Sequence, residues 1–296
     1  MELRILNYFL MVAREENITK AASLLHLTQP TLSRQLMQLE EELGVQLFTR
    51  SKHRIVLTDD GMLLRRRAEE LVSLAEKTKE ELQHQQKELS GKVYIGSGEL
   101  QSSQFLAQLI FAFRQKHPLV QFELYSGHSD NIKERIEQGL LDVGLLQEPV
   151  DISKYDFLRT PMKEKWGVLV SEDCPLAQKE AVTPKDLAQA PLILPQRESV
   201  VNELSHWFGE YAHQIHAIAT GNLEYNLAIL ARNHLGCVIA VKLDCQFDGV
   251  KFIPLSPKLE SGTVLVWKKN TVFSPATTAF LQEAKEYLSG MKEDVN

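Results

Sequence analysis

The spacing of apolar residues changes along this chain near Ser90 and Gly91, and this change limits the folds that are possible. Before Ser90, apolar residues recur every three or four positions, which indicates amphipathic helices. After Gly91, short apolar runs alternate with amphipathic segments, a pattern typical of β/α units. These runs include residues 93–95, 120–124, 143–146 and 192–194. The sequence therefore predicts an all-α N-terminal part, followed by an α/β part with a mostly parallel sheet covered by helices.

The composition excludes several classes of protein. A length of 296 residues with 44% hydrophobic and 24% charged residues is typical of a globular chain of two or three domains. The three cysteines, Cys174, Cys237 and Cys245, are too few for a disulfide framework. No signal peptide or membrane span is expected, so we predict a cytoplasmic protein without a membrane partner. The net charge of -6 excludes a uniformly basic nucleic-acid-binding surface, although a local basic surface remains possible.

Two short helices with a tight turn are predicted before residue 44. Asn17 can cap a helix over residues 18–26, and Thr28 can cap a helix over residues 29–43 that ends at Gly44. The outer face of the second helix carries side chains able to hydrogen-bond with base edges: Gln29, Pro30, Thr31, Ser33, Arg34, Gln35 and Gln38. This pattern is typical of a helix-turn-helix whose second helix enters the major groove. The alternative is a three-helix bundle whose polar face has no such role.

A basic hairpin is predicted directly after these helices. Residues 46–50 and 54–58 alternate as two short strands, with Arg50, Lys52 and Arg54 near the turn. A basic hairpin beside a groove-reading helix is placed to contact phosphates or the minor groove. The alternative is an ordinary solvated turn.

An ordered set of motifs over residues 9–61 resembles the N-terminal signature of LysR-type transcriptional regulators. The motifs are Phe9, Ala21-Ala22, residues 27–35, Leu39-Glu40, Leu43-Gly44, residues 47–50 and residues 57–61. The resemblance implies a winged helix-turn-helix domain over residues 1–58 that binds double-stranded promoter DNA as a dimer or tetramer, with RNA polymerase as a further partner. In that domain, Gln29, Pro30, Thr31, Ser33 and Arg34 would contact bases, while Thr28, Arg50 and Arg54 would contact phosphates.

A long helix is predicted from Thr58 or Asp59 to about Leu89, which makes residues 59–90 a linker. Apolar residues recur along it with alternating steps of four and three, a mean period of about 3.5, as in coiled coils. The expected dimer seam includes Leu64, Ala68, Leu71, Ala75 and Leu82. A two-fold dimer would bind a pseudo-palindromic site with half-sites about one helical turn apart. The alternative is a helix docked on its own C-terminal domain.

Residues 91–296 resemble the effector-binding domain of the same family, which is similar to periplasmic solute-binding proteins. The resemblance implies two α/β lobes joined by two crossovers. We expect lobe I at residues 91–162 and 267–296, and lobe II at residues 163–266. A small-molecule effector of unknown identity would bind between them.

Loops that follow the strands of an open α/β sheet are the best candidates for binding the effector. Their candidate contacts are Ser102, Ser126, Gln147, Arg197 and Asn222. Arg197 can bind a carboxylate or phosphate with two donors. Glu99 instead favours a ligand that carries an amine or a hydroxyl group, or it forms an ion pair with Arg197.

No motif of an enzyme is found. The sequence Gly96-Ser97-Gly98 lacks the third glycine of a dinucleotide fingerprint, and there is no Walker-A or Gly-x-Ser-x-Gly motif. His206, His213 and His216 lack further ligands for a metal. We therefore expect no enzyme activity, metal or cofactor. Two alternatives stay open, a solute-binding module with an unrelated helical front, and a regulator with a vestigial cleft that a partner protein controls.

Overall fold

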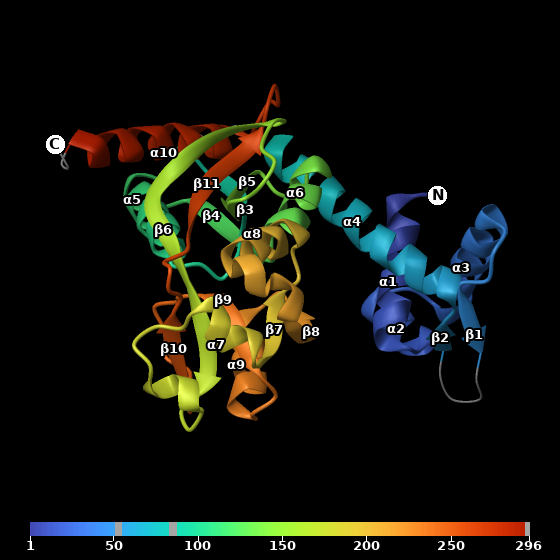
Figure 1. Cartoon of the computed structure of the whole chain (residues 1–296). Coiled ribbons are helices and arrows are strands. Elements are labelled where there is room, and N and C mark those ends of the chain that lie inside the picture. Colours follow the sequence, from blue (N-terminus) through green and yellow to red (C-terminus); the bar gives the residue numbers. More distant parts are fainter. Residues whose placement is uncertain (51–54, 83–87, 294–296) are drawn as a thin grey trace. The chain divides into compact units, whose positions relative to one another are not determined.

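The computed structural model describes residues 1–50, 55–82 and 88–293 (Figure 1). The chain divides into two compact units, Met1–His84 and Gln85–Asn296. This division falls before the expected joint at Ser90-Gly91, because Leu89 packs against the core of the second unit. No helix among the described residues is long and apolar enough to cross a membrane.

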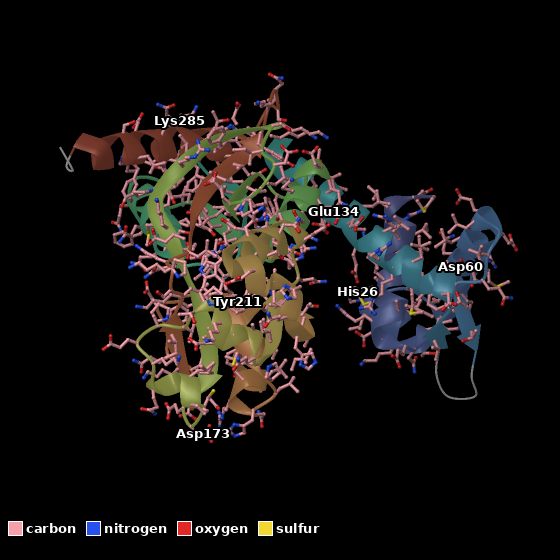
Figure 2. The ribbon with its side chains drawn as sticks, in the orientation of Figure 1. His26, Asp60, Glu134, Asp173, Tyr211 and Lys285 are labelled. Carbon is pink, nitrogen blue, oxygen red and sulfur yellow. The ribbon has the colours of Figure 1, made fainter. Side chains whose placement is uncertain are left out.

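The first unit begins with three helices, α1 (Leu3–Glu15), α2 (Ile18–Leu24) and α3 (Gln29–Leu43). The side chain of Asn17 accepts a hydrogen bond from the Lys20 backbone N–H at 2.9 Å and so caps α2 as expected. α2 ends two residues earlier than predicted. His26, labelled in Figure 2, takes a left-handed conformation with φ of 55° in the turn before α3. The buried faces of these helices form one apolar core around Leu6, Phe9, Val12, Ala21, Leu32, Leu36 and Leu39.

The predicted hairpin is present. Strand β1 (Phe48–Arg50) pairs antiparallel with β2 (Ile55–Leu57). Residues 51–54, which include Lys52 and Arg54, lie outside the described residues. With the three helices, this hairpin makes a winged helix-turn-helix, which confirms the predicted fold of the N-terminal part.

The long helix α4 covers Asp59–Leu82. The prediction that it reaches Leu89 is wrong at its C-terminal end, because residues 88–90 are not helical. Ala68 is fully buried and packs, together with Leu64, against the core of the three preceding helices. One face of α4 is therefore used within its own unit.

The second unit is a mixed sheet covered by helices. Its first elements are β3 (Gly91–Ser97), α5 (Ser103–Lys116), β4 (Val120–Ser126), α6 (Ser129–Glu137), β5 (Val143–Gln147) and β6 (Tyr155–Ser171). Next come η1 (Pro175–Gln178), α7 (Pro184–Ala188), β7 (Pro191–Pro195), α8 (Glu198–Phe208), η2 (Gly209–Gln214) and β8 (His216–Gly221). The last are α9 (Glu224–Arg232), β9 (Cys237–Val241), β10 (Val250–Pro254), β11 (Glu260–Lys268) and α10 (Pro275–Glu293).

The strand order is β4-β3-β5-β11-β6-β9-β7-β8, with β10 paired to β6. The prediction of parallel strands holds for β3 with β4 and β5, and for β7 with β8 and β9. In the middle of the order, β6 and β11 run antiparallel to their neighbours. The sheet is therefore mixed, because β6 and β11 carry the chain from one end of the strand order towards the other and back.

The strand β6 belongs to two lobes, and it runs the length of the unit in Figure 1. Residues 155–165 of β6 pair with β11, whereas residues 166–171 pair with β9 and β10. Separate apolar cores lie in the two lobes, around Phe113 and Phe280 in the first and Val168 and Phe208 in the second. The predicted two-lobed α/β fold is confirmed.

The chain re-enters the first lobe before residue 267, where the boundary between the lobes was expected. Residues 263–267 of β11 pair with β5, and Leu265 and Trp267 lie in the core of the first lobe. The strand β11 therefore belongs to the first lobe, because its hydrogen-bond partners and its buried side chains are there.

Candidate functional site

A cavity of about 90 Å³ lies between the two lobes, at the carboxyl ends of β3, β5 and β7. Its apolar wall includes Leu100, Leu145, Trp166, Val200, Leu227 and Ile239, and its polar lining includes Glu99, His128, Gln147, Arg197, Asn222 and Glu224. The loops that follow strands therefore meet here, as the rule for open α/β sheets predicts.

Three of the five candidate effector contacts line this cavity, namely Gln147, Arg197 and Asn222. The structure places the other two elsewhere. Ser102 is fully buried before α5, where its backbone N–H donates to Glu164 at 2.9 Å. Ser126 is exposed at the end of the edge strand β4. The position of a residue after a strand did not show whether its side chain reaches the cavity.

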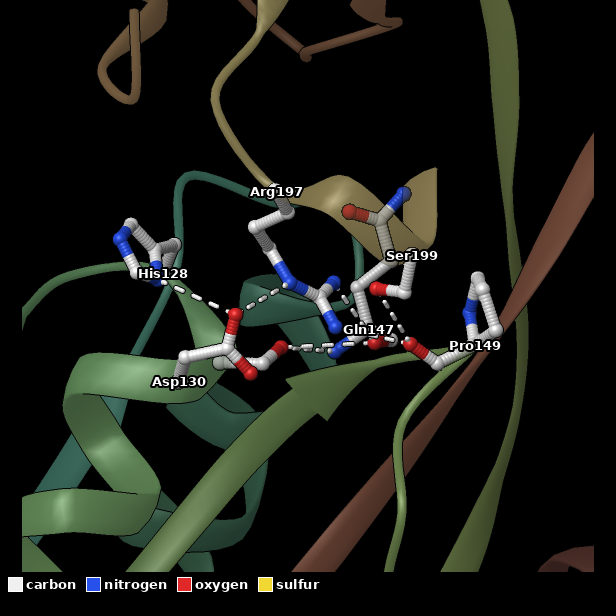
Figure 3. Close-up of polar contacts among 7 residues, drawn as sticks. His128, Asp130, Gln147, Pro149, Arg197 and Ser199 are labelled. Atoms are coloured by element: carbon white, nitrogen blue, oxygen red, sulfur yellow. Dashed lines mark hydrogen bonds and ion pairs between the residues drawn. The ribbon is translucent and has the colours of Figure 1, made fainter. Parts of the chain in front are cut away.

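Arg197 connects the lobes, as Figure 3 shows. It precedes α8 in the second lobe, and its Nη1 and Nη2 donate to the carbonyl oxygens of Gln147 at 3.2 Å and Pro149 at 2.8 Å in the first lobe. Its Nε lies 3.5 Å from Oδ2 of Asp130 on α6. Ser199 Oγ also donates to Pro149 at 3.4 Å.

This arrangement corrects two expectations about Arg197. The side chain is 7% exposed, and Nη1 and Nη2 each donate to a backbone carbonyl oxygen of the first lobe, whereas the buried Nε has no hydrogen-bond partner among the described residues. Arg197 therefore does not present both Nη atoms freely to a carboxylate. Its acidic partner is Asp130 rather than Glu99. The sequence did not show this, because the carbonyl groups that Arg197 contacts are backbone atoms some fifty residues away.

Three carboxylates gather beside the cavity. Both oxygens of Glu164 accept backbone N–H groups at the start of α5, from Gln101 and Ser102, each at 2.9 Å. One oxygen of Glu99 accepts the backbone N–H of Glu224, which begins α9. The Glu224 side chain accepts the Val241 N–H at 3.2 Å through Oε1, while its buried Oε2 has no hydrogen-bond partner among the described residues.

The environment of Glu224 disfavours its charged form. Burial raises the pKa of Glu224 to about 9, and the neighbouring Glu99 and Glu164 act in the same direction. The sequence analysis missed Glu224, because an acid in the first turn of a helix is common on electrostatic grounds alone. His128, also missed, has its pKa lowered by burial, so its imidazole is neutral near pH 7.

The start of α3 is the second candidate site. Thr28, Gln29, Pro30, Thr31 and Arg34 are exposed, whereas Ser33 is half-buried. Their hydroxyl and amide groups are arranged by two contacts, Thr28 Oγ1 to Thr31 Oγ1 at 2.8 Å and Gln29 Nε2 to Ser33 Oγ at 2.9 Å. The Thr28 side chain therefore bonds to a side chain rather than capping the helix backbone.

The basic residues of the hairpin cannot be placed in the same way. Arg54 lies outside the described residues, and only the backbone of Arg50 is described, paired with Ile55. The face of α3 is thus the described part of the predicted DNA-contacting surface.

The expected dimer seam on α4 is only partly exposed. Ala68 is buried within its own chain, so it is not available for a partner, and Leu64 is half-buried beside it. Ala75 is half-buried, and the side chain of Leu82 is outside the described set. Leu71 is exposed, as are Leu63, about two turns before it, and Leu74, about one turn after it. Within the described part of α4, the exposed apolar stripe is therefore displaced from the predicted one towards Leu63 and Leu74.

No group of three or more histidine, cysteine, aspartate or glutamate side chains in the described ranges is placed to hold a metal ion.

The family models that match the chain cover both units. The model for the bacterial regulatory helix-turn-helix protein of the lysR family matches residues 3–62, and the LysR substrate binding domain matches residues 86–289.

Relatives are similar over all or part of their length. The regulator YwbI of Bacillus subtilis is 29% identical over 300 aligned residues, 99% of each chain. The activator HcaR of the Hca operon of Escherichia coli is 29% identical over 98% of this chain and 99% of its own. The regulator YvbU of Bacillus subtilis is 33% identical, and the match spans 66% of each chain.

The fold is similar to that of CbnR, a LysR family regulator whose crystal structure has a TM-score of 0.76 to this one at 19% identity. That match covers 97% of this chain and 99% of CbnR. A winged helix-turn-helix followed by a two-lobed α/β unit defines a class of transcription regulators. The chain belongs to the LysR family of transcriptional regulators, and its relatives are regulators rather than enzymes.

Proposed function

We propose that this protein is a cytoplasmic regulator that binds a pseudo-palindromic double-stranded DNA site as a dimer. The observation that carries this proposal is the exposed start of α3, where Gln29, Thr31 and Arg34 project from a helix whose opposite face is buried. Side chains of these types pair with base edges in the major groove. CbnR has also been solved in complex with its target DNA, which supports DNA binding by this chain.

In this proposal residues 1–58 bind DNA and residues 59–90 provide the dimer contact. Pro30 and Ser33 would join Gln29, Thr31 and Arg34 at the bases, while Thr28, Arg50 and Arg54 would contact phosphates. The exposed residues Leu63, Leu71 and Leu74 supply an apolar stripe on α4 that a second copy can cover. Pairing of dimers into a tetramer and contact with RNA polymerase are further parts of the proposal.

Residues 91–296 would bind a small-molecule effector in the cavity between the lobes. The support is the position of the cavity and the three candidate residues that line it, Gln147, Arg197 and Asn222. A ligand changes the activity of such a protein only if it binds one arrangement of the lobes better than another. The alternative of a vestigial cleft controlled by a partner protein predicts that no small molecule stabilises this unit.

Selection from random duplexes with the full-length protein tests the DNA-binding proposal. We expect enrichment of an inverted repeat, with half-sites about one helical turn apart and binding that weakens as salt rises. Recovery of random sequence with no repeat, or a protein that remains monomeric on its DNA, would contradict it.

A further inference from the structure

We propose that the interlobe cavity is built for a small amine, with the ammonium group between Glu99 and Glu224 and an apolar body against the wall of the second lobe. This inference rests on the proposed binding of an effector in the cavity and adds the chemical class of that effector.

The carboxylates of the cavity are arranged to accept a cation. Glu99 and Glu224 both line the cavity, and they are adjacent because one oxygen of Glu99 accepts the Glu224 backbone N–H. Glu164 lies close enough to raise the pKa of Glu224, although its own oxygens are taken by the start of α5. An ammonium group would therefore lie near the carboxyl groups of Glu99 and Glu224. Each of these groups uses one oxygen to accept a backbone N–H and leaves the other oxygen for a ligand.

The positive charge of the cavity is already paired within the protein. Within the described residues that line it, the side chains able to carry positive charge are Arg197 and His128. Arg197 donates to the carbonyl oxygens of Gln147 and Pro149 and forms an ion pair with Asp130, although its Nε lacks a hydrogen-bond partner among the described residues, and burial keeps His128 neutral near pH 7. A carboxylate ligand would have to compete with Asp130 for Arg197 and would lie in the same cavity as Glu99 and Glu224, which is unfavourable in a partly buried site.

The oxygen Oε2 of Glu224 is the specific acceptor. It is buried and has no hydrogen-bond partner among the described residues, and a buried polar atom left unpaired costs free energy. Desolvation, Glu99 and Glu164 raise the pKa of this carboxyl, while the Val241 N–H lowers it. An ammonium group at Oε2 would supply both the missing hydrogen bond and the missing counter-charge, so the carboxyl would bind it as a carboxylate.

The walls of the cavity limit the rest of the ligand. Leu100, Trp166, Val200 and Ile239 present apolar surface, which suits an apolar body such as a short hydrocarbon chain. The Gln147 amide, whose Nε2 is buried without a partner, is placed to hydrogen-bond with a second polar group of the ligand.

The test compares ligands that differ only in their polar group. Butylamine, butanol and butyrate have the same alkyl chain, and each is titrated into the full-length protein while the thermal unfolding midpoint is measured. We expect butylamine to raise the midpoint in a saturable way, well above the other two. Glu224→Gln and Glu99→Gln should each weaken this binding about tenfold or more, since each removes a charge-assisted contact. Glu210→Gln, on the exposed surface of η2, is the matched control and should leave it unchanged.

The outcomes separate this inference from the proposed function. If butyrate binds best, or if Glu224→Gln leaves the amine affinity unchanged, the assignment of an amine is overturned while control by a small molecule stands. If none of the three compounds shifts the midpoint, the amine assignment is also overturned. DNA binding is judged by its own titration, which does not use these compounds.

Discussion

Arg197 Nη2 lies 2.8 Å from the carbonyl oxygen of Pro149, and this hydrogen bond joins the second lobe to the first. The same guanidinium reaches Gln147 and Asp130, so one buried side chain holds three groups of the opposite lobe (Figure 3). The relative position of the lobes at the cavity thus depends on a contact made by the protein itself.

Arg197→Ala should lower the free energy of unfolding of the full-length protein by about 2–4 kcal/mol, because it removes charge-assisted hydrogen bonds from buried acceptors. Urea unfolding provides the measurement. Arg159→Ala is the matched control, since Arg159 contacts Glu148 at 3.3 Å but its side chain is 63% exposed. The control should change stability by less than about 0.5 kcal/mol. Equal effects of the two substitutions would argue against a special role for Arg197.

Arg34→Ala should weaken binding to the selected DNA site by about 1–3 kcal/mol and relax the preference at one base pair, if the guanidinium pairs with a guanine. Thermal stability should not change, because Arg34 is exposed. Fluorescence anisotropy with the selected duplex and its single-base variants gives both quantities. Arg14→Ala, on α1, serves as the control for loss of one positive charge. An unchanged affinity and base preference in the Arg34 variant would exclude this residue from base recognition.

Substitutions on α4 distinguish its two faces. Leu71→Glu should shift the protein from dimer towards monomer in sedimentation experiments, because Leu71 is exposed on the proposed dimer contact. Ala68→Leu should instead destabilise the first unit by about 1–3 kcal/mol, since Ala68 has no exposed surface and a larger side chain would overpack the core. A dimer that survives the Leu71 substitution would locate the contact on another part of the chain.

Stability should depend on pH through Glu224. The pKa of Glu224 is about 9 in the folded protein against an ordinary value of 4.5, so between these pH values the folded state binds more protons than the unfolded state. The free energy of unfolding therefore falls as pH rises through this range, and the contribution of Glu224 is complete only below pH 4.5.

The variant Glu224→Gln removes this titration while keeping an oxygen for the Val241 N–H. Relative to the unsubstituted protein, its stability should rise by roughly 1–3 kcal/mol between about pH 5 and pH 9, as measured by urea unfolding. Glu210→Gln should show no such trend. A difference that stays constant over this range would mean that Glu224 is charged in the folded state.

Local features of the fold were predictable from the sequence. Helix α3 starts at Gln29 and stops at Gly44, where φ is 71°, because Pro30 suits a first helical turn and glycine tolerates a left-handed end. The strands β3, β4, β5 and β7 were visible as apolar runs. Each of these signals involves residues within one turn or one strand, so no knowledge of distant contacts is needed.

The periodicity of α4 led to a wrong assignment for Ala68. The repeat of apolar residues identified a helix with a buried face, but a core and a dimer seam produce similar repeats. Only the packing of Ala68 and Leu64 against α1 and the neighbouring helices showed which face the chain buries itself.

The sequence by itself determined the family, the order of helices and strands, and the exposed polar start of α3, because periodicity, capping and ordered motifs are local. The tertiary structure decided how the cavity is charged. Arg197 is engaged by the backbone oxygens of Gln147 and Pro149, and Glu224 is brought beside Glu99, more than a hundred residues earlier in the chain. These pairings depend on which chain segments are in contact where the two lobes pack together. The spacing of residues along the sequence does not indicate such contacts.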